Sequence, residues 1–314
     1  MTKNSKESPP NASATPSIYF YPMGGLTHLI SRLTYTISAA THIGKSWTTL
    51  PLGKSLAARE FLHGTHEVTA GNYLPFSRDY WPLIELMGIH EGSKATWDAT
   101  LPGKYFIDAE EGPATLASVN QILKTQSQIC FTAGEPDDTQ PKFPLIPMEK
   151  WLRPSAATLA HLGFFLRGLP DNYIAVHFRG TDREADLFEL ILRTNEALSN
   201  ISRPLPPLLF CSDVDGAYEL FSQAIDQHLG IDVQQINPPI RLNSEETNTH
   251  QLRAKRYREA KGSEKIAFTE VLEDLLILTF SEKTIFSASG GGWPGLVGRL
   301  KTSSEARQAF FGMT

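Results

Sequence analysis

The C-terminal half of the chain alternates short apolar runs with longer stretches in which apolar residues recur every three or four positions. Runs of the first kind predict buried strands, and stretches of the second kind predict amphipathic helices. Because the two kinds alternate, we expect a parallel sheet with right-handed crossover connections. The predicted strands are 173–178, 207–211, 231–236 and 283–287, and the predicted helices are 155–166, 182–198, 216–229 and 263–281.

The N-terminal half begins with a similar pattern. Residues 17–21 are aromatic and β-branched, as in a buried strand, and a glycine turn at 23–25 precedes a helical pattern that starts at Leu26. Residues 46–50 predict the next strand. Strand, turn, helix and strand are the start of a doubly wound unit. For residues 52–130 we expect mixed short helices and strands, with loops at glycine and proline positions.

Two segments interrupt these patterns. Residues 1–16 are polar and carry almost no large apolar side chains, which predicts a disordered tail. Residues 134–154 are rich in proline and charge, as in a linker or a long surface loop. We therefore predict one domain over 17–150 and a second over 151–314. Two such α/β halves in tandem predict a ligand cleft at the carboxyl ends of the strands.

Composition narrows the class of protein. The chain has 314 residues, of which 41% are hydrophobic and 20% charged, enough for two domains with apolar cores. The net charge of -5 argues against a general nucleic-acid binder. No apolar stretch has the length of a signal peptide core or a membrane span, so we expect a cytoplasmic protein. Cys130 and Cys211 form neither a disulfide framework nor a thiolate zinc motif, and Cys211 is predicted to be buried.

Polar residues gather just after three predicted strands, at 177–183, 212–216 and 287–292. The carboxyl ends of parallel strands meet at one edge of the sheet, so these segments are expected to line one cleft. Arg179 offers five fixed donors that suit a diphosphate. Hydroxyl groups and free backbone N–H groups in the third segment could hold phosphate. Each feature also has a plainer interpretation: an Arg179–Asp182 surface ion pair, an N-cap at Asp182, or a flexible glycine loop.

Other motifs are weaker. The pair Gly24-Gly25 is either a tight turn or a place where the backbone approaches a ligand closely, and His28 and Arg32 in the following helix could donate to that ligand. Asp213 and Asp215 have the spacing of a metal-binding DxD motif, but acidic residues also favour a helix start. His63 and His66 show no partner set. We therefore predict no metal site.

Residues 174–183 resemble the first signature of the α1,6-fucosyltransferase and protein O-fucosyltransferase superfamily, a hydrophobic strand followed by His-x-Arg-x-x-Asp. Residues 209–213 are similar to the second, a strand ending in Ser-Asp. Residues 273–289 are similar to the third, a helical Asp followed by a serine cluster. Residues 23–26 stand where the family has a glycine-containing loop. The chain length is close to that of the bacterial nodulation members.

The resemblance implies a GT-B fold, with two Rossmann-like domains whose parallel sheets face a central cleft. It implies an acceptor-side domain at 17–150, a nucleotide-sugar-binding domain at 151–314, and a metal-independent inverting transfer of fucose from GDP-fucose to a glycan or peptide hydroxyl, without a cofactor. Catalytic roles are predicted for His177, Arg179 and Asp182. The resemblance places Arg179 on the β-phosphate, Asp274 on the guanine edge, and Asp213 near the sugar. The predicted donor-binding residues are Gly24, Gly25, His177, Arg179, Arg183, Asp213, Asp274, Ser287, Ser289 and Gly290.

The chain departs from the family pattern at three positions. Gly180 stands where many members have a second arginine, and Arg183 where the α1,6 enzymes have lysine. Leu187 falls at or near the acid proposed as the base in those enzymes. The nearby acids are Asp182, Glu184 and Asp186, and the sequence does not select among them.

Two alternatives therefore stay open: a glycosyltransferase that uses another donor such as GDP-mannose, and a nucleotide-sugar-binding protein without catalysis. The sequence determines neither the acceptor nor the oligomeric state. Several aromatic residues could stack on a sugar or belong to the core: Tyr73, Phe76, Trp81 and Trp293.

Overall fold

The computed structural model describes residues 18–20, 26–49, 121, 124, 129–131, 144–179, 186–199, 201, 204–212, 214, 216–236, 266–288 and 292–313. By contacts between residues, the chain divides into two compact units. The first comprises Met1–Pro22, Ser31–Leu74 and Glu91–Ile146, and the second comprises Met23–Ile30, Pro75–His90 and Pro147–Thr314.

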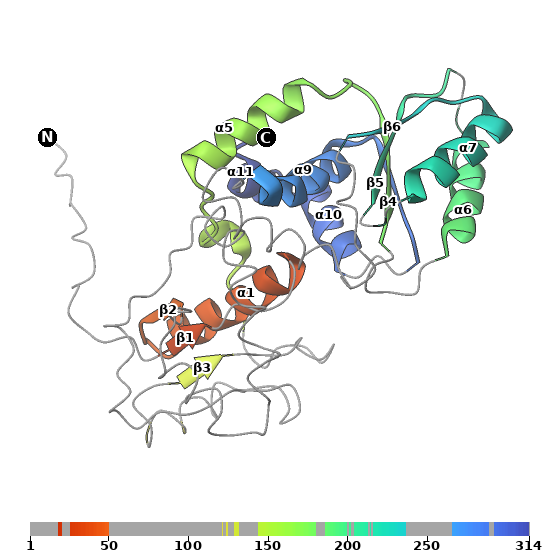
Figure 1. Cartoon of the computed structure of the whole chain (residues 1–314). Helices are drawn as coiled ribbons and strands as arrows, with labels where there is room; N and C mark the ends of the chain where they lie inside the picture. The colour runs from red at the N-terminus through yellow and green to blue at the C-terminus, as the bar shows by residue number, and fades with distance from the viewer. Residues whose placement is uncertain are drawn as a thin grey trace, which may run out of the picture. The chain divides into compact units, whose positions relative to one another are not determined.

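The first unit contains a three-stranded parallel sheet in the order β2-β1-β3 (Figure 1). The strands are β1 (Ile18–Phe20), β2 (Trp47–Thr49) and β3 (Ile129–Phe131), and Ile18 pairs with both Trp47 and Ile129. The predicted strands at 17–21 and 46–50 are thereby confirmed. Strand β3 begins at the end of the segment 52–130, for which the sequence predicted mixed short helices and strands without bounds.

Helix α1 (Leu26–His42) begins in the second unit, and its residues from Ser31 onward belong to the first. Its residues from Leu33 to Ala40 are all buried. The buried Ser38 hydroxyl donates to the Thr34 carbonyl at 2.5 Å and accepts the Ile146 N–H at 2.7 Å. A buried hydroxyl needs such partners, because leaving it unpaired costs about 1–3 kcal/mol.

The second unit is built on a four-stranded parallel sheet in the order β6-β5-β4-β7. The strands are β4 (Ile174–Phe178), β5 (Leu208–Ser212), β6 (Val233–Gln235) and β7 (Lys283–Phe286). Both β4 and β5 are buried along their whole length, which explains why their sequences are apolar runs without alternation. The predicted α/β class with parallel sheets is confirmed.

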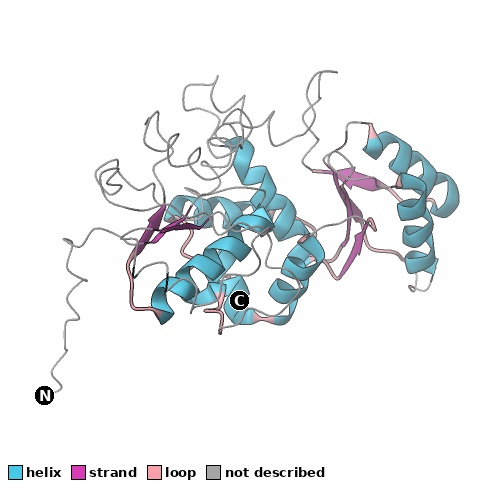
Figure 2. Ribbon diagram, turned by 90° about the horizontal axis from the view of Figure 1, so that it is seen from below, coloured by secondary structure: helices cyan, strands magenta, loops and turns pink. Residues whose placement is uncertain are grey.

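Helices α6 (Leu187–Ser199) and α7 (Ala217–Leu229) cover one face of this sheet, and α9 (Ile266–Phe280) packs against the other face (Figures 1 and 2). Alternate strand residues such as Ile174, Val176 and Phe210 join the core under α6 and α7. Within it Phe210 stacks on Phe221 with ring centroids 4.6 Å apart. Each such buried side chain contributes about 1.5–3 kcal/mol through the hydrophobic effect.

The remaining elements are η3 (Met148–Lys150), α5 (Ala156–Arg167), α10 (Trp293–Thr302) and α11 (Ser304–Phe311). Ser155 caps α5 by accepting the Thr158 N–H at 3.1 Å, as the helix predicted at 155–166 requires. The sequence analysis did not predict α10 and α11. Two signals were present: Pro294 in the first turn of α10, and Ser303, which caps α11 by accepting the Ala306 N–H.

Candidate functional site

The strand order of the second unit makes one edge of its sheet a candidate ligand site. From β4 the chain proceeds outward through β5 to β6, and it then crosses back to place β7 on the other side of β4. The order therefore reverses between β4 and β7. Open parallel sheets bind ligands outside the carboxyl ends of the strands at such a reversal, because the two flanking connections leave in opposite directions and open a crevice.

Three predicted site residues stand at this reversal. His177 pairs in register with Phe286 of β7, and the Ser287 N–H donates to the His177 carbonyl at 3.0 Å. The Arg179 N–H approaches the Ser287 hydroxyl oxygen at 3.4 Å. Ser287 is buried, whereas Arg179 is partly exposed. The structure thus brings together the ends of two strands that lie more than one hundred residues apart in the sequence.

His177 is an unusual residue for a strand end. Its side chain is only 7% exposed, and Nδ1 is buried without a hydrogen-bond partner among the described residues. Burial, and secondarily the charge of Arg179, lowers the pKa of His177 from 6.5 to about 3. The imidazole is therefore neutral at physiological pH. It can exchange hydrogen bonds with a ligand, but it is poorly suited to proton transfer near pH 7.

Two aromatic rings enclose this imidazole. Phe286 meets it edge-on, with ring centroids 5.8 Å apart and planes at 62°. Trp293, the first residue of α10, lies over it with a centroid distance of 5.4 Å and a tilt of 31°. The aromatic neighbours and the strand position together account for the burial of His177.

Asp274 of α9 reaches the same face of the sheet. The Cys211 thiol donates a hydrogen bond to its carboxylate, and Cys211 is the register partner of His177 on β5. Burial raises the pKa of the Cys211 thiol, and the charge and hydrogen bond of Asp274 raise it further. Although Cys, His and Asp are neighbours, the sulfur stays protonated and is no nucleophile. The prediction that Cys211 is buried is confirmed.

One polar pair beside this site was missed by sequence reasoning. His161 Nε2 of α5 lies 2.5 Å from Oε1 of Glu273, the buried residue that precedes Asp274. The pair connects α5 to α9. No local signal predicts the pair, because the two residues are 112 positions apart in the sequence.

The start of α10 makes a second close approach. Gly292, its N-cap residue, lies against Thr27 in the first turn of α1, which belongs to the same compact unit. A Cβ atom at Gly292 would lie 2.8 Å from Thr27 Oγ1 and 2.9 Å from Thr27 Cβ. Glycine is therefore required at 292 for steric reasons, because these two segments leave no room for a side chain.

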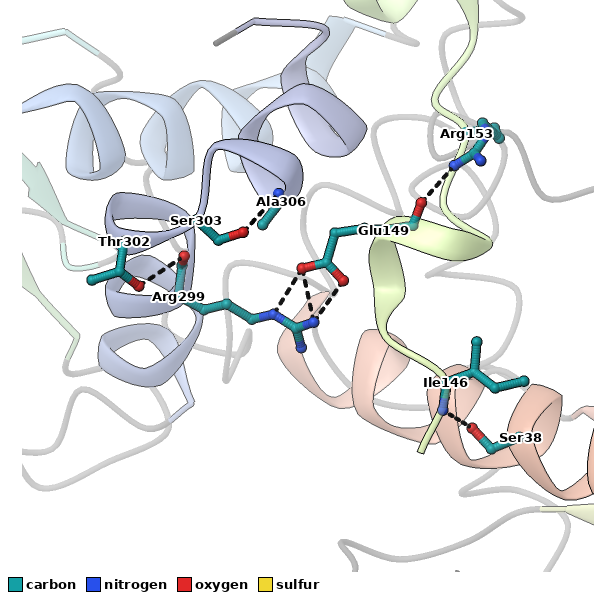
Figure 3. Close-up of polar contacts among 8 residues, drawn as sticks. All are labelled: Ser38, Ile146, Glu149, Arg153, Arg299, Thr302, Ser303 and Ala306. Atoms are coloured by element: carbon teal, nitrogen blue, oxygen red, sulfur yellow. Dashed lines mark hydrogen bonds and ion pairs between the residues drawn. The ribbon is translucent and has the colours of Figure 1, made fainter. Parts of the chain in front are cut away.

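The far end of α10 is held by charged side chains. Arg299 forms a forked pair with Glu149 of η3, at 2.8 Å from Nη2 to Oε1 and 2.6 Å from Nη2 to Oε2 (Figure 3). Lys301 Nζ donates to the Ser281 carbonyl at 2.7 Å, and burial lowers the pKa of Lys301. Arg307 Nη1 donates to the Leu300 and Lys301 carbonyls. Arg307 thus satisfies two carbonyl groups in the last turn of α10, and Lys301 satisfies a carbonyl just beyond the end of α9.

The other predicted site residues lie outside the described residues. They are Gly24, Gly25, Asp182, Arg183, Asp213, Ser289 and Gly290. The same holds for Gly180, Glu184 and Asp215, for His63, His66, Tyr73, Phe76 and Trp81, and for the side chains of His28 and Arg32. In the described part of the chain, no three His, Cys, Asp or Glu side chains are grouped as around a metal ion.

Two described residues lie near the position where the catalytic base is expected. Leu187 is the first residue of α6 and packs against the apolar core. Asp186 caps the same helix, since its Oδ1 accepts the Phe188 N–H at 2.8 Å. Asp186 therefore already has a structural role.

Comparisons with known proteins give matches among solved structures alone. No protein-family model matches the chain, and no curated protein matches it. One solved structure is the crystal structure of NodZ α1,6-fucosyltransferase soaked with GDP-fucose, at a TM-score of 0.46 and 13% identity, covering 91% of this chain and 92% of that one. Another is POFUT1 in complex with GDP, at 0.48 and 12%, covering 95% and 96%. The first carries the name of the enzyme class that the sequence signatures resemble. At such low identities and TM-scores, neither likeness assigns an activity to this chain.

Among the described helices, none has both the length and the apolar character needed to cross a bilayer.

Proposed function

We propose that this protein is an inverting, metal-independent glycosyltransferase that transfers fucose from GDP-fucose to a hydroxyl group of a glycan or peptide. One observation carries the proposal: His177, Arg179 and Ser287 converge where the strand order reverses between β4 and β7. A cation, a hydroxyl and a neutral imidazole at the carboxyl edge of a parallel sheet suit a nucleotide diphosphate. The sequence signatures that contain these residues supply the choice of donor.

In this proposal Arg179 binds the β-phosphate of GDP and Ser287 contributes to phosphate binding. The acceptor oxygen attacks the anomeric carbon from the face opposite the diphosphate, while the bond from that carbon to the β-phosphate oxygen breaks. The leaving oxygen takes the electron pair, and the Arg179 charge stabilises it. The proton of the acceptor hydroxyl passes to a carboxylate, for which Asp182 and Glu184 are the candidates. Asp274 reads the guanine edge, and Asp213 lies near the sugar.

We further propose a GT-B fold of two Rossmann-like domains, with the acceptor-side domain at 17–150 and the donor domain at 151–314, each containing the parallel sheet of one compact unit. The presence of a parallel sheet in each unit supports this assignment.

Calorimetric titration with GDP, GDP-fucose, UDP and ADP, without added metal, tests the donor site. We expect selective binding of the guanine nucleotides, and a loss of about 10- to 150-fold in GDP affinity in Arg179→Ala, the range for hydrogen bonds to a charged group. Arg193→Ala is the matched control, because within the part of the chain that the structure describes Arg193 forms an exposed 3.7 Å pair with Glu189. Unchanged GDP affinity without Arg179, or no GDP binding, would contradict the proposal. An absolute need for Mg²⁺ or Mn²⁺ would contradict its metal-independent part.

The structure also favours a second candidate, a nucleotide-sugar-binding protein without catalysis. Leu187 packs against the core and offers no carboxylate, and one oxygen of the nearby Asp186 already caps α6. Tight GDP-fucose binding with no release of GDP, in the presence of glycan or peptide acceptors or of water alone, would select this candidate. Competition between GDP-fucose and GDP-mannose separates the donor alternatives.

A further inference from the structure

Trp293 occupies a position that the proposed donor site does not yet explain. It is the first residue of α10, it is partly buried, and its ring lies 5.4 Å from the imidazole of His177 at a tilt of 31°. Phe286 bounds the imidazole from the neighbouring strand. Between these rings the imidazole has little freedom to turn.

The need for such a restraint comes from Nδ1 of His177. This nitrogen is buried and has no hydrogen-bond partner among the described residues. A histidine ring is normally oriented by a hydrogen bond to one of its nitrogens. Where that bond is missing, ring contacts are the remaining means of fixing the side chain, and an aromatic neighbour also keeps water away from the nitrogen.

Helix α10 is suited to hold a ring in a set position. Its start is fixed by the close approach of Gly292 to Thr27. Its end is fixed by the fork between Arg299 and Glu149 and by the bonds of Lys301 to Ser281. A ten-residue helix held at both ends presents its first side chain rigidly.

We infer that Trp293 is a positioning residue of the nucleotide-sugar site, and that its indole ring holds the His177 imidazole in the orientation in which the ring can hydrogen-bond the donor. This inference rests on the proposed function. Trp293 acts through His177 and takes no part in the bond changes.

A double-mutant cycle on GDP affinity tests the inference. Trp293→Ala is expected to weaken GDP binding about 2- to 10-fold, the range for an aromatic contact, whereas Trp293→Phe keeps a ring and most of the affinity. In a His177→Ala background, Trp293→Ala should cause no further loss, because the side chain that it positions is absent. Equal affinity in Trp293→Ala, or additive losses in the double variant, would overturn the inference.

Kinetics and fluorescence give readouts that a merely structural role would not produce. A positioning role raises KM for GDP-fucose with little change in kcat, whereas partial unfolding lowers the apparent kcat and leaves KM unchanged. Nucleotide binding should also change tryptophan emission in the wild type and in the control Trp151→Phe, but not in Trp293→Phe. Since the Phe variant keeps an aromatic ring, this measurement holds even where the Ala variant does not fold. An undiminished emission change in Trp293→Phe would contradict the inference.

Failure of the proposed function and failure of the inference about Trp293 give different results. A wild-type protein that binds no guanine nucleotide defeats the proposed function, and the inference falls with it. If the wild type binds GDP and Trp293→Ala binds it equally tightly, only the inference about Trp293 is contradicted.

Discussion

At the scale of single residues, His177 shows how a strand position alters chemistry. The same imidazole on a surface loop would titrate near pH 6.5. On β4 it is enclosed by Phe286 and Trp293 and lies near Arg179, so that its pKa falls to about 3. The residue thereby loses its usual role as a proton carrier and keeps its capacity for hydrogen bonding.

This pKa predicts a specific dependence of stability on pH. Below pH 6.5 the imidazole of the unfolded chain binds a proton, whereas the folded imidazole stays neutral until about pH 3. The unfolded state therefore binds more protons across this window, and the free energy of unfolding falls as the pH decreases. Compared with His177→Gln, the wild type should lose up to about 1.4 kcal/mol more per pH unit between pH 6 and pH 4. Above pH 6.5 the difference in unfolding free energy between the wild type and His177→Gln should be constant.

Urea denaturation followed by circular dichroism at several pH values measures this difference. Parallel curves of unfolding free energy against pH for the two proteins would show that the folded His177 titrates normally.

At the scale of elements, α10 connects local sequence to the site. Its glycines have different surroundings. Gly292 lies against Thr27, whereas a Cβ atom at Gly295 would meet nothing within 4 Å. The two glycines belong to the same short segment, so the difference in space around them comes from Thr27 and not from the helix itself.

Substitutions at these two glycines should therefore have opposite effects. Gly292→Ala is expected to lower the free energy of unfolding by about 1–3 kcal/mol, the cost of forcing extra volume into a packed site. Gly295→Ala should raise it by about 0.5–1 kcal/mol, because alanine loses less conformational entropy in a helix. Thermal denaturation of both variants measures the effects. Thr27→Ala should recover part of the loss in Gly292→Ala, and the absence of any recovery would place the strain elsewhere.

At the scale of the whole molecule, the net charge does not favour the proposed ligand. The chain carries a net charge of -5, yet the proposed ligand is a dianionic or trianionic nucleotide. In the proposed function, binding therefore comes from Arg179 and oriented donors at the strand ends, and not from long-range attraction.

A ligand that binds only the folded chain should stabilise the whole molecule. GDP at 100 times its dissociation constant is expected to add about 2.7 kcal/mol to the free energy of unfolding, and to raise the melting temperature by a few degrees. Differential scanning calorimetry with GDP, and with UDP at the same concentration, measures this effect. Arg179→Ala is the control in which the rise should largely disappear. A rise of equal size with UDP would show that the site does not discriminate the base.

Sequence reasoning predicted the parts of the fold and site that local patterns encode. The apolar runs that became β4, β5 and β7 and the periodic stretches that became α5, α7 and α9 were recognised, and the polar strand ends that hold His177, Arg179 and Ser287 followed from them. Such patterns are local because strand and helix geometry place side chains with short periods. The ranges of α10 and α11 were not predicted, and in α10 the weak helix formers Pro294, Gly295 and Gly298 obscure the helical pattern.

By itself, then, the sequence determined a chain of strands and helices with polar residues after three strands. The tertiary structure alone decided that β7 lies beside β4, that the buried His177 ring contacts Trp293, that Asp274 accepts a hydrogen bond from the Cys211 thiol, and that Thr27 lies against Gly292. Each of these facts joins residues far apart along the chain. They depend on how whole elements pack, which no short-range periodicity encodes.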